Sequence, residues 1–329
     1  GCTWQYADYE RQLAWKREVV AGQLAHIGRL EEVDVRAPIA PGSPFAYRNR
    51  MDFAVSDGRP ALHENASNRL VALDGCPLLK PALAERFAAL GDLAGVRKVV
   101  LRTGVNTGEN LILLEGRAPS HARTWDSSVV VRSSDDLHTL KGRPWFEEEI
   151  DGARFRVPAS AFFQVNTEGA EVLVTLATKA AGVTRDDILL DGYAGVGLFA
   201  ATVGRPARRV ITIDSEKASF RAITGNLDEA IPGAYQSMLG RFEQTAAAVK
   251  DRWDVAIVDP PRAGLGVDGV DAVARTAPRT IVLISCDPAS LARDAGLLTT
   301  SGYRLDWVQP VDLFPQTYHI ETVARFELR

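Results

Sequence analysis

Cysteine, methionine and histidine are scarce in this chain of 329 residues, which contains three, two and five of them. The three cysteines, Cys2, Cys76 and Cys286, are too few for a disulfide framework, so a reducing cytoplasm is the simpler location. The histidines show no spacing typical of metal ligands, which argues against a zinc site. The composition therefore excludes a small, disulfide-stabilised secreted domain.

Long apolar runs and an excess of positive charge are also missing. No stretch reaches the roughly 18 uninterrupted apolar residues of a membrane span, and residues 188–204, which come closest, contain Asp191 and four glycines. A net charge of −4 gives no global basic field, so any nucleic-acid site must be a local patch. No signal peptide is visible, and a start at Gly1-Cys2 without an initiator methionine is expected of a fragment or a trimmed product.

What the chain does have is an ordinary soluble composition, 46% hydrophobic and 24% charged, at a length that predicts two domains with a smaller appendage. Residues 4–30 are predicted to be helical, because apolar side chains recur about once per turn. A linker rich in proline and glycine follows at 38–44. We expect a helical segment at 1–36, a mixed and mainly β domain at 37–153, and an α/β domain at 154–329.

The central part, residues 45–150, consists of short alternating runs separated by turn signals. Asp57-Gly58, Thr103-Gly104 and Thr107-Gly108 are such signals, and they predict antiparallel strands joined by hairpins. A helix near 81–93 interrupts them.

In the last part, apolar runs alternate with amphipathic segments, which predicts a parallel sheet with helices on both faces. The run 319–328 is predicted to be a last strand at the sheet edge. The predicted helices are 167–181, 197–203, 215–229, 267–275 and 288–299, and the other predicted strands are 188–191, 209–213, 254–259 and 280–285.

Three loops that follow predicted strands carry a glycine turn, an acid and a thiol. Asp191 to Gly197 follow the first strand, Asp259-Pro-Pro-Arg262 follow the third, and Cys286 follows the fourth. Ligands of open α/β sheets bind outside the carboxyl ends of the strands. The sequence therefore predicts a cofactor site beside a nucleophile.

The glycine turn favours a nucleoside cofactor other than a dinucleotide. Gly195 and Gly197 permit a tight turn and a close approach to a ligand, but Ala200-Ala201 stand where a dinucleotide fingerprint needs glycine. The pattern Asp-x-x-x-Gly-x-Gly resembles methyltransferases that bind S-adenosylmethionine, and Asp214 at the next strand end is placed to bond a ribose diol. The alternative is a plain tight turn with a solvated carboxylate.

The acid and the thiol each have two interpretations. Two prolines make the loop of Asp259 rigid, and Arg262 replaces the aromatic residue that adenine-N6 chemistry would need. The alternative is a turn that merely ends a strand. Cys286 precedes a predicted helix whose N-terminus could lower the pKa of the thiol. The alternative is a small buried hydrophobic residue.

Two further segments carry candidate groups. Glu321 lies among apolar neighbours in the last strand, where a buried carboxylate would have a raised pKa and could accept a proton. The alternative is an exposed charge on an edge strand. Phe162 and Gln164 combine a ring that could stack on a base with an amide that could bond a ligand, and the alternative places the phenylalanine in the core.

Together and in this order, these motifs resemble the RNA uracil-C5 methyltransferases, which make 5-methyluridine in transfer and ribosomal RNA. The resemblance covers nearly the whole chain. It implies a Rossmann-like, class I methyltransferase domain that uses S-adenosylmethionine, and a smaller, mainly β domain that binds RNA. The motifs that carry it are Phe-Phe-Gln-Val-Asn at 162–166, the residues 191–199, Asp-Pro-Pro-Arg-Ala-Gly at 259–264, Ser-Cys-Asp-Pro-Ala at 285–289 and His-Ile-Glu-Thr-Val at 319–323.

The resemblance also implies roles for single residues. Cys286 would be the nucleophile and Glu321 the base, while Phe162 and Arg262 would contact the substrate. Leu198 stands where many members carry a polar residue, so a side-chain bond to the cofactor is lost there. The implied cofactor residues are Gln164, Tyr193, Gly195, Gly197, Leu198, Asp214 and Asp259.

The N-terminus resembles the ribosomal-RNA branch of this family. Gly1-Cys2-Thr-Trp-Gln-Tyr looks like the end of a cysteine-rich segment that helps to hold a four-iron cluster, and Cys76 would supply the last ligand. The first two ligands and a β-barrel RNA-binding domain would precede Gly1. We therefore expect a partial cluster site, ribosomal rather than transfer RNA as substrate, no membrane partner, and a monomer.

The implied chemistry explains the residue types. A thiolate that adds to carbon 6 of uracil makes carbon 5 nucleophilic, and a base must later remove the carbon-5 proton. No metal is needed, but the target base must leave its stack. Alternatives are a transfer-RNA enzyme, a non-catalytic RNA-binding protein on this fold, a DNA cytosine-C5 enzyme, and an NAD oxidoreductase. The DNA cytosine-C5 enzyme is disfavoured because the loop at Asp259 lacks the cysteine that such an enzyme carries there. The NAD oxidoreductase is disfavoured by the glycine spacing.

Overall fold

The computed structural model describes residues 2–134 and 136–329, which form two compact units. We call them the β unit and the α/β unit. The expected boundaries differ from this division, because residues 154–158 pair with a strand of the β unit and the N-terminal helix packs within the α/β unit. The β unit contains residues 43–150 and 154–167, and the α/β unit contains residues 2–42, 151–153 and 168–329.

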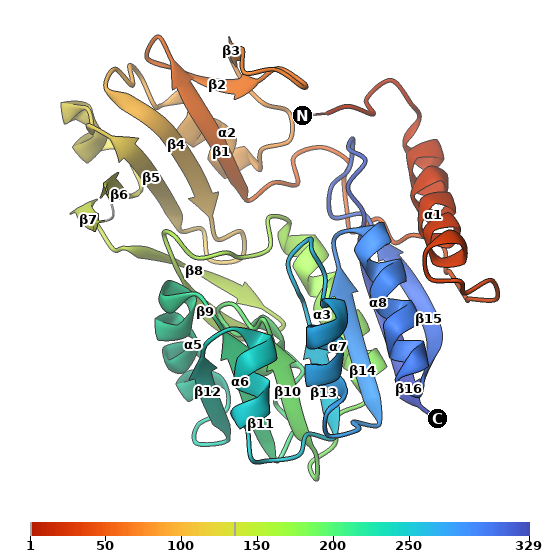
Figure 1. The fold of residues 1–329 in the computed structure, drawn as a ribbon. Helices are drawn as coiled ribbons and strands as arrows, with labels where there is room; N and C mark the ends of the chain where they lie inside the picture. Colours follow the sequence, from red (N-terminus) through yellow and green to blue (C-terminus); the bar gives the residue numbers. More distant parts are fainter. Residues whose placement is uncertain (1, 135) are drawn as a thin grey trace. The chain divides into compact units, whose positions relative to one another are not determined.

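The β unit is built on a seven-stranded sheet in the order β3-β2-β1-β4-β5-β6-β7 (Figure 1). Neighbouring strands are antiparallel except β5 and β6, which run parallel. The antiparallel prediction is wrong for this pair, because the chain crosses over through the 3-10 helix η1, Ser120–Thr124. The strands are β1 (Arg50–Ser56), β2 (Arg59–His63), β3 (Leu70–Ala72), β4 (Val96–Thr103), β5 (Asn110–Gly116), β6 (Ser128–Ser133) and β7 (Asp136–Lys141), with β8 (Trp145–Ile150) and β9 (Ala153–Pro158) forming a separate pair.

Local sequence explains two features of this unit. Asp57 and Gly58 have φ of +50° and +71°, as the tight hairpin between β1 and β2 requires, so that predicted turn is confirmed. Helix α2 (Pro81–Ala88) begins with a proline, whose missing N–H costs nothing in the first turn. Its Phe87 packs edge-on against Phe53 of β1, with ring centroids 5.1 Å apart.

The α/β unit contains the second seven-stranded sheet, in the order β12-β11-β10-β13-β14-β16-β15. The first five strands are parallel, and β16 runs antiparallel to both β14 and β15. Strands β11 and β12 lie on one side of β10, and β13 lies on its other side, so the strand order reverses between β10 and β13. The ligand crevice is expected at the carboxyl ends of these two strands. The strands are β10 (Ile188–Gly192), β11 (Arg209–Asp214), β12 (Tyr235–Leu239), β13 (Val255–Val258), β14 (Thr280–Ser285), β15 (Tyr303–Val311) and β16 (Glu321–Leu328).

Helices cover this sheet in layers. In one layer α6 packs on α7, α7 on α8, and α8 on α1, while α4 packs on α5. Figure 1 shows α6, α7 and α8 in front of the sheet and α3 behind it. The central strands β10, β13 and β14 are buried along their whole length, as parallel strands between two helical layers must be. The helices are α1 (Tyr9–His26), α3 (Thr167–Ala181), α4 (Leu198–Thr202), α5 (Lys217–Ala230), α6 (Phe242–Ala248), α7 (Gly266–Ala274) and α8 (Pro288–Thr300).

Three differences from the predicted elements stand out in this unit. The sequence reading missed β12, α6 and β15, and it extended α1 to 4–30, beyond the observed Tyr9–His26. The last strand, β16, is not at the edge, because β15 lies outside it. Strand β12 is only half-buried, and β15 contains Gln309 and Pro310 just before its last residue, so neither shows a clear alternating pattern.

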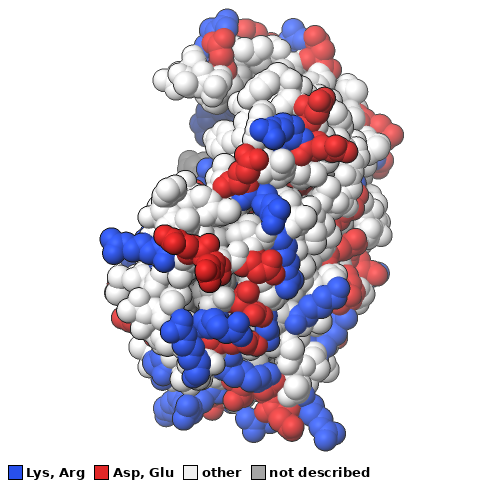
Figure 2. Space-filling model, turned by 90° about the vertical axis from the view of Figure 1, so that its right-hand side faces the viewer, with Lys and Arg blue, Asp and Glu red and all other residues white. Residues whose placement is uncertain are grey.

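Within residues 2–134 and 136–329, no helix combines the length and the apolar character needed to cross a membrane. Figure 2 shows basic and acidic side chains interspersed on the face that it displays. Separately from that view, ion pairs also link acidic and basic side chains of β15 and β16, such as Arg304 with Glu327 at 2.6 Å and Arg325 with Asp306 at 2.7 Å.

Candidate active site

The loop after β10 makes a tight turn that depends on two glycines. Gly195 and Gly197 have φ of +56° and +93°, which are left-handed values. A Cβ at position 197 would lie 2.8 Å from Cγ1 of Ile223 in α5, so this turn also lacks space for a side chain. Gly195 donates its N–H to Oδ2 of Asp214 at 2.8 Å, which fixes the loop to the end of β11. The structure thus brings together the glycines and the acid that the sequence singled out.

Asp214 is held by the backbone on both sides. While Oδ2 accepts from Gly195, Oδ1 accepts the N–H of Glu216 at 2.7 Å. Burial raises the pKa of Asp214, and these hydrogen bonds oppose the rise. A carboxylate has about four acceptor positions, so a ribose diol could still bond to it, and the ribose contact stays a prediction.

Asp191, the fourth residue of β10, is a candidate cofactor residue that the sequence analysis left without a role. Its carboxyl group is fully buried. Oδ2 accepts the N–H of Ala200 at 2.8 Å, while Oδ1 has no hydrogen-bond partner among the described residues. Burial raises the pKa of Asp191 to about 8, the bond from Ala200 opposes this, and the charges of Asp259 and Asp214 add to it.

A buried oxygen without a partner calls for a donor from a ligand. S-adenosylmethionine has an ammonium group and ribose hydroxyls as donors, and the turn at Gly195 and Gly197 lets a ligand approach the backbone. The residues present therefore fit this cofactor. The sequence signal was available, since Asp191 begins the glycine pattern.

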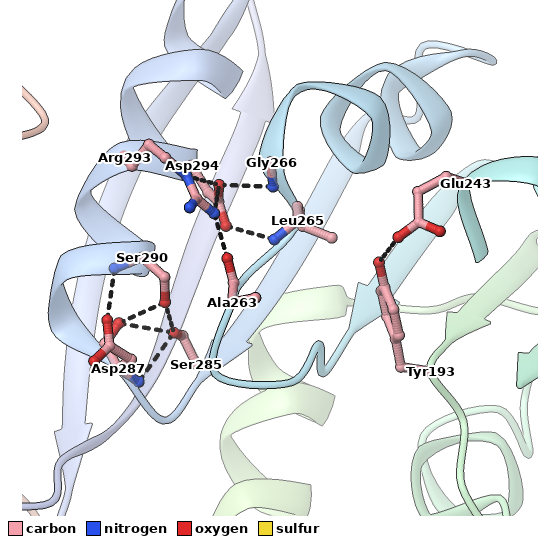
Figure 3. A network of polar contacts seen from close by, with 10 residues as sticks. All are labelled: Tyr193, Glu243, Ala263, Leu265, Gly266, Ser285, Asp287, Ser290, Arg293 and Asp294. Carbon is pink, nitrogen blue, oxygen red and sulfur yellow. Dashed lines mark hydrogen bonds and ion pairs between the residues drawn. The ribbon is translucent and has the colours of Figure 1, made fainter. Parts of the chain in front are cut away.

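Two other predicted cofactor residues take defined positions. The hydroxyl of Tyr193 donates to Oε1 of Glu243 in α6 at 2.8 Å (Figure 3). The ring of Tyr193 lies 4.9 Å from that of Phe242. Leu198 is the first residue of α4 and is buried. Contacts of Tyr193 and Leu198 with a cofactor remain predictions.

The loop that carries Asp259 and Arg262 is tied to helix α8. Asp294 of α8 is buried and accepts the N–H groups of Leu265 and Gly266 at 2.7 and 3.1 Å (Figure 3). Its neighbour Arg293 donates to the carbonyl of Ala263 at 2.7 Å. Because α8 begins just after Cys286, these bonds couple the loop after β13 to the segment that holds the thiol.

Gly264 makes this connection possible. Its φ is +72°, and a Cβ there would lie 2.3 Å from Oδ2 of Asp294 and 2.6 Å from Nη2 of Arg293. Asp259 itself follows β13, and its N–H bonds to the carbonyl of Gly192 at 3.3 Å. Burial raises the pKa of Asp259.

Cys286 and Glu321 come together at the end of the pair formed by β14 and β16. Ser285 lies opposite Thr322 in this antiparallel ladder, and the hydroxyl of Thr322 donates to the carbonyl of Ser285 at 2.9 Å. Continuing the register by one residue places Cys286 opposite Glu321. The structure therefore brings close together two residues that are 35 positions apart in the sequence (321 − 286), and the charge of Glu321 acts on the thiol of Cys286. Their catalytic roles remain predictions.

The expected lowering of the thiol pKa is wrong. Burial raises the pKa of Cys286 to about 11, the charges of Glu321 and Asp259 raise it as well, and Arg262 lowers it. The helix N-terminus does not compensate, because the carboxylate of Asp287 caps α8 and takes the N–H of Ser290 at 2.8 Å (Figure 3). Without another charge, the free thiol is protonated at neutral pH.

Glu321 is buried, with 4% of its surface exposed, so the interpretation as an exposed edge charge is excluded. Burial raises its pKa well above the usual value, Asp259 adds to this, and Arg262 opposes it. Arg262 is thus the cation that lowers the pKa of both the thiol and this carboxyl group. Its Nη2 lies 3.2 Å from Nδ1 of His319, two residues before Glu321.

Phe162 and Gln164 belong to the β unit. The buried guanidinium of Arg102 holds their segment by donating to the carbonyl of Ala161 at 2.7 Å, and the amide of Asn49 donates to the carbonyl of Gln164 at 3.0 Å. Phe162 is 55% exposed, so the core interpretation is wrong for this ring. Its contact with a base, and that of Gln164 with the cofactor, remain predictions.

The cysteine cluster does not fit the residues present. Cys2 lies in the α/β unit and Cys76 in the β unit, and both are half-buried. In the part of the chain that the structure describes, no group of three or more His, Cys, Asp or Glu side chains is arranged to hold a metal ion. A four-iron cluster takes four thiolates.

Known proteins resemble this chain along its whole length. An uncharacterised RNA methyltransferase of Gloeobacter violaceus is 32% identical, over 99% of this chain and 80% of the relative. An uncharacterised RNA methyltransferase of Thermosynechococcus vestitus is 33% identical, over 98% of this chain and 81% of the relative. The sequence profile described as tRNA (Uracil-5-)-methyltransferase matches residues 249–327, which include Asp259, Cys286 and Glu321.

A solved structure resembles the fold as well. The tRNA (uracil-54, C5)-methyltransferase of Pyrococcus abyssi, in complex with S-adenosyl-L-homocysteine, superimposes with a TM-score of 0.80 and is 28% identical. The match covers 99% of this chain and 85% of the other. The similarity therefore extends over both units and all the segments that carry the candidate site.

Proposed function

The chain belongs to the RNA uracil-C5 methyltransferase family, and on this premise we propose that it methylates carbon 5 of uridine in ribosomal RNA through a covalent bond from Cys286 to carbon 6. One observation supports the catalytic part most strongly. Cys286 and Glu321 directly adjoin the paired residues Ser285 and Thr322 of β14 and β16, and the charge of Glu321 acts on the thiol. This arrangement suits chemistry on two neighbouring ring atoms. The predicted fold, a class I methyltransferase domain with a smaller, mainly β domain, is confirmed.

The first step forms the bond between sulfur and carbon 6. The thiol of Cys286 loses its proton to the carboxylate of Asp259 as sulfur adds, so Glu321 stays ionised for the last step. The electrons of the ring double bond move toward the oxygen on carbon 4. Carbon 5 then becomes the nucleophile. Arg262 favours this step, because its charge lowers the pKa of the thiol.

S-adenosylmethionine, when bound, supplies an electrophilic methyl group. Asp191, Asp214 and the turn at Gly195 and Gly197 would hold it at the crevice, and we assign further contacts to Gln164, Tyr193, Leu198 and Asp259. The solved relative with S-adenosyl-L-homocysteine supports this cofactor.

The last step restores the aromatic ring. Glu321 takes the proton from carbon 5, the electron pair of that bond re-forms the ring double bond, and sulfur leaves carbon 6. A raised pKa makes the ionised carboxylate of Glu321 a stronger base than an exposed one. Phe162 is proposed to stack on the target base and Arg262 to contact it.

Ribosomal RNA is the proposed substrate because the segment after Cys2 resembles the ribosomal branch. Transfer RNA is the second candidate, because the relative of known structure is a tRNA (uracil-54, C5)-methyltransferase. The test incubates the protein with a labelled methyl donor and separate pools of unmodified ribosomal and transfer RNA. We expect labelled 5-methyluridine in ribosomal RNA only. Label in transfer RNA alone would show that transfer RNA is the substrate instead.

We propose that the protein is cytoplasmic, because three cysteines form no disulfide framework. We also propose that it is a monomer. Light scattering coupled to size exclusion is expected to give the mass of one chain. The iron–sulfur cluster is no part of the proposal, since the described residues do not fit it.

A further inference from the structure

The loop from Asp312 to Ile320, between β15 and β16, leads directly into Glu321 and is unusually buried for a loop. Its residues are buried except Phe314 and His319, which are half-buried, and Tyr318, which is 59% exposed. Such a loop would normally turn its polar atoms to water. Here a buried loop presents one aromatic ring to solvent, three residues before the proposed catalytic base.

Helix α1 holds this loop in place. Nζ of Lys16 lies 2.6 Å from Oδ1 of Asp312 and donates to the carbonyl of Phe314 at 3.1 Å. Neither side chain of this ion pair is more than 1% exposed. Gln12 and Gln316 exchange two bonds, at 3.0 and 3.1 Å. The loop is therefore fixed before any ligand arrives, which lowers the ordering cost of binding.

The rings of this loop form one cluster of tilted and edge-on contacts, which we call the stacking platform: Phe314, Tyr318 and His319. The ring of Tyr318 lies 4.4 Å from that of His319, and His319 lies 5.7 Å from Phe314 at an angle of 68°. Arg262 adds a positive charge, since its Nη2 lies 3.2 Å from the imidazole of His319.

We propose that the stacking platform binds a nucleotide base that flanks the target uridine in unpaired RNA, an inference that rests on the proposed function. Aromatic rings are the common receptors for unstacked bases, and every base has a face that can stack. A uridine that leaves its stack deprives its neighbour of a partner, which an exposed ring beside the site can replace. Arg262 suits the phosphate between the two nucleotides.

The alternative occupant, a protein partner, is disfavoured by the size of the surface. A stable protein interface buries about 800 Å² on each side, whereas this loop exposes one large ring among buried neighbours. A single base is the ligand of matching size.

The test uses single-stranded RNA nonamers with a central 5-fluorouridine, whose fluorine cannot leave as a proton does, so the methylated adduct with Cys286 persists. One nonamer is intact, and two others replace the 5′ or the 3′ neighbour by an abasic ribose. With S-adenosylmethionine present and RNA below saturation, the rate of adduct formation is read on denaturing gels. The proteins compared are the wild type, Tyr318→Ala, Tyr318→Phe and Leu328→Ala, the last at the opposite end of β16.

On the intact RNA we expect Tyr318→Ala to be about 10-fold slower than the wild type, and Tyr318→Phe and Leu328→Ala to match it. One abasic neighbour is expected to slow the wild type by the same factor and to leave Tyr318→Ala no slower than before. Equal rates for Tyr318→Ala and the wild type on all three RNAs would overturn the platform alone. Failure of the wild type to form any adduct would instead contradict the proposed function.

Discussion

The carboxylates of the cofactor half of the site and those of its chemical half, around Cys286 and Glu321, have different surroundings. In the cofactor half, Asp191 and Asp214 accept backbone N–H groups, so the loop itself fixes their oxygens. In the chemical half, Cys286 and Glu321 share their surroundings with Asp259 and are balanced chiefly by the charge of Arg262. The difference teaches that this fold positions its binding groups with backbone hydrogen bonds, whereas burial and one cation set the pKa values of its reactive groups.

Removing the sulfur should give the largest effect in either half. Cys286→Ala is expected to lower methyl transfer by a factor on the order of 10⁴ or more, because no other group can bond to carbon 6. Transfer of labelled methyl groups to RNA measures this, with thermal unfolding as a check on the fold. Turnover near the wild-type rate would remove Cys286 as the nucleophile.

Removing the base should stop the reaction at a later point. Glu321→Gln is expected to transfer one methyl group and then retain the RNA, because the carbon-5 proton stays in place and sulfur cannot leave. The adduct appears on a denaturing gel in the presence of the labelled donor. Glu327→Gln, on the same strand, serves as the control and should turn over normally, and a Glu321→Gln protein that does so too would contradict the assignment.

Removing the cation tests the electrostatic part of the comparison. Arg262 lowers the pKa of Cys286, so Arg262→Gln is expected to raise that pKa further and to leave less thiolate at any pH below it. The rate of adduct formation at neutral pH should fall about 10-fold, and its rise with pH should move to higher pH. Arg304→Gln is the control. An unshifted profile would mean that Arg262 acts only on the substrate.

In the cofactor half, Asp191→Asn should weaken binding of S-adenosylmethionine about 10-fold, the loss of one charge-assisted hydrogen bond, and change the rate at saturation little. Calorimetric titration measures this, with exposed Asp186→Asn as control.

The same substitution has a consequence for stability. The folded-state pKa of Asp191 is about 8, above its unfolded value, so the free energy of unfolding of the wild type should fall as pH rises from about 4 to about 8. Asp191→Asn removes that fall. The unfolding free energy of both proteins is measured by denaturant titration at several pH values. An equal dependence on pH in the wild type and in Asp191→Asn would show that Asp191 is not the group that titrates.

The smallest effect is expected where the two halves are connected. Asp294→Asn weakens the bonds to Leu265 and Gly266, at a cost of about 1–3 kcal/mol in unfolding free energy, and should slow turnover a few-fold by loosening the loop of Arg262. Its pH profile should shift in the same direction as that of Arg262→Gln, whereas the exposed Asp268→Asn should not. A loss of stability without this shift would assign Asp294 a purely structural role.

The sequence predicted the parallel part of the fold well, because buried strands such as β13 and β14 leave continuous apolar runs. It missed β12, α6 and β15, whose burial is partial or irregular. Among site residues it indicated Cys286 and the glycines from their place at strand ends, and Glu321 from its apolar neighbours in a strand. It gave Asp191 no role, because the lack of a hydrogen-bond partner for its Oδ1 among the described residues becomes apparent only in the folded structure. It also predicted a lowered pKa for the thiol of Cys286, whereas burial raises that pKa.

By itself, the sequence determined which groups are available: one thiol after a strand, one acid in an apolar strand, and two glycines in a turn. These follow from local chemistry and strand periodicity, which the chain carries without reference to distant residues. Only the tertiary structure decided that β16 lies between β14 and β15, and so that residue 321 faces residue 286. Register and burial arise from contacts between segments far apart in the chain, and the pKa values at the site depend on those contacts.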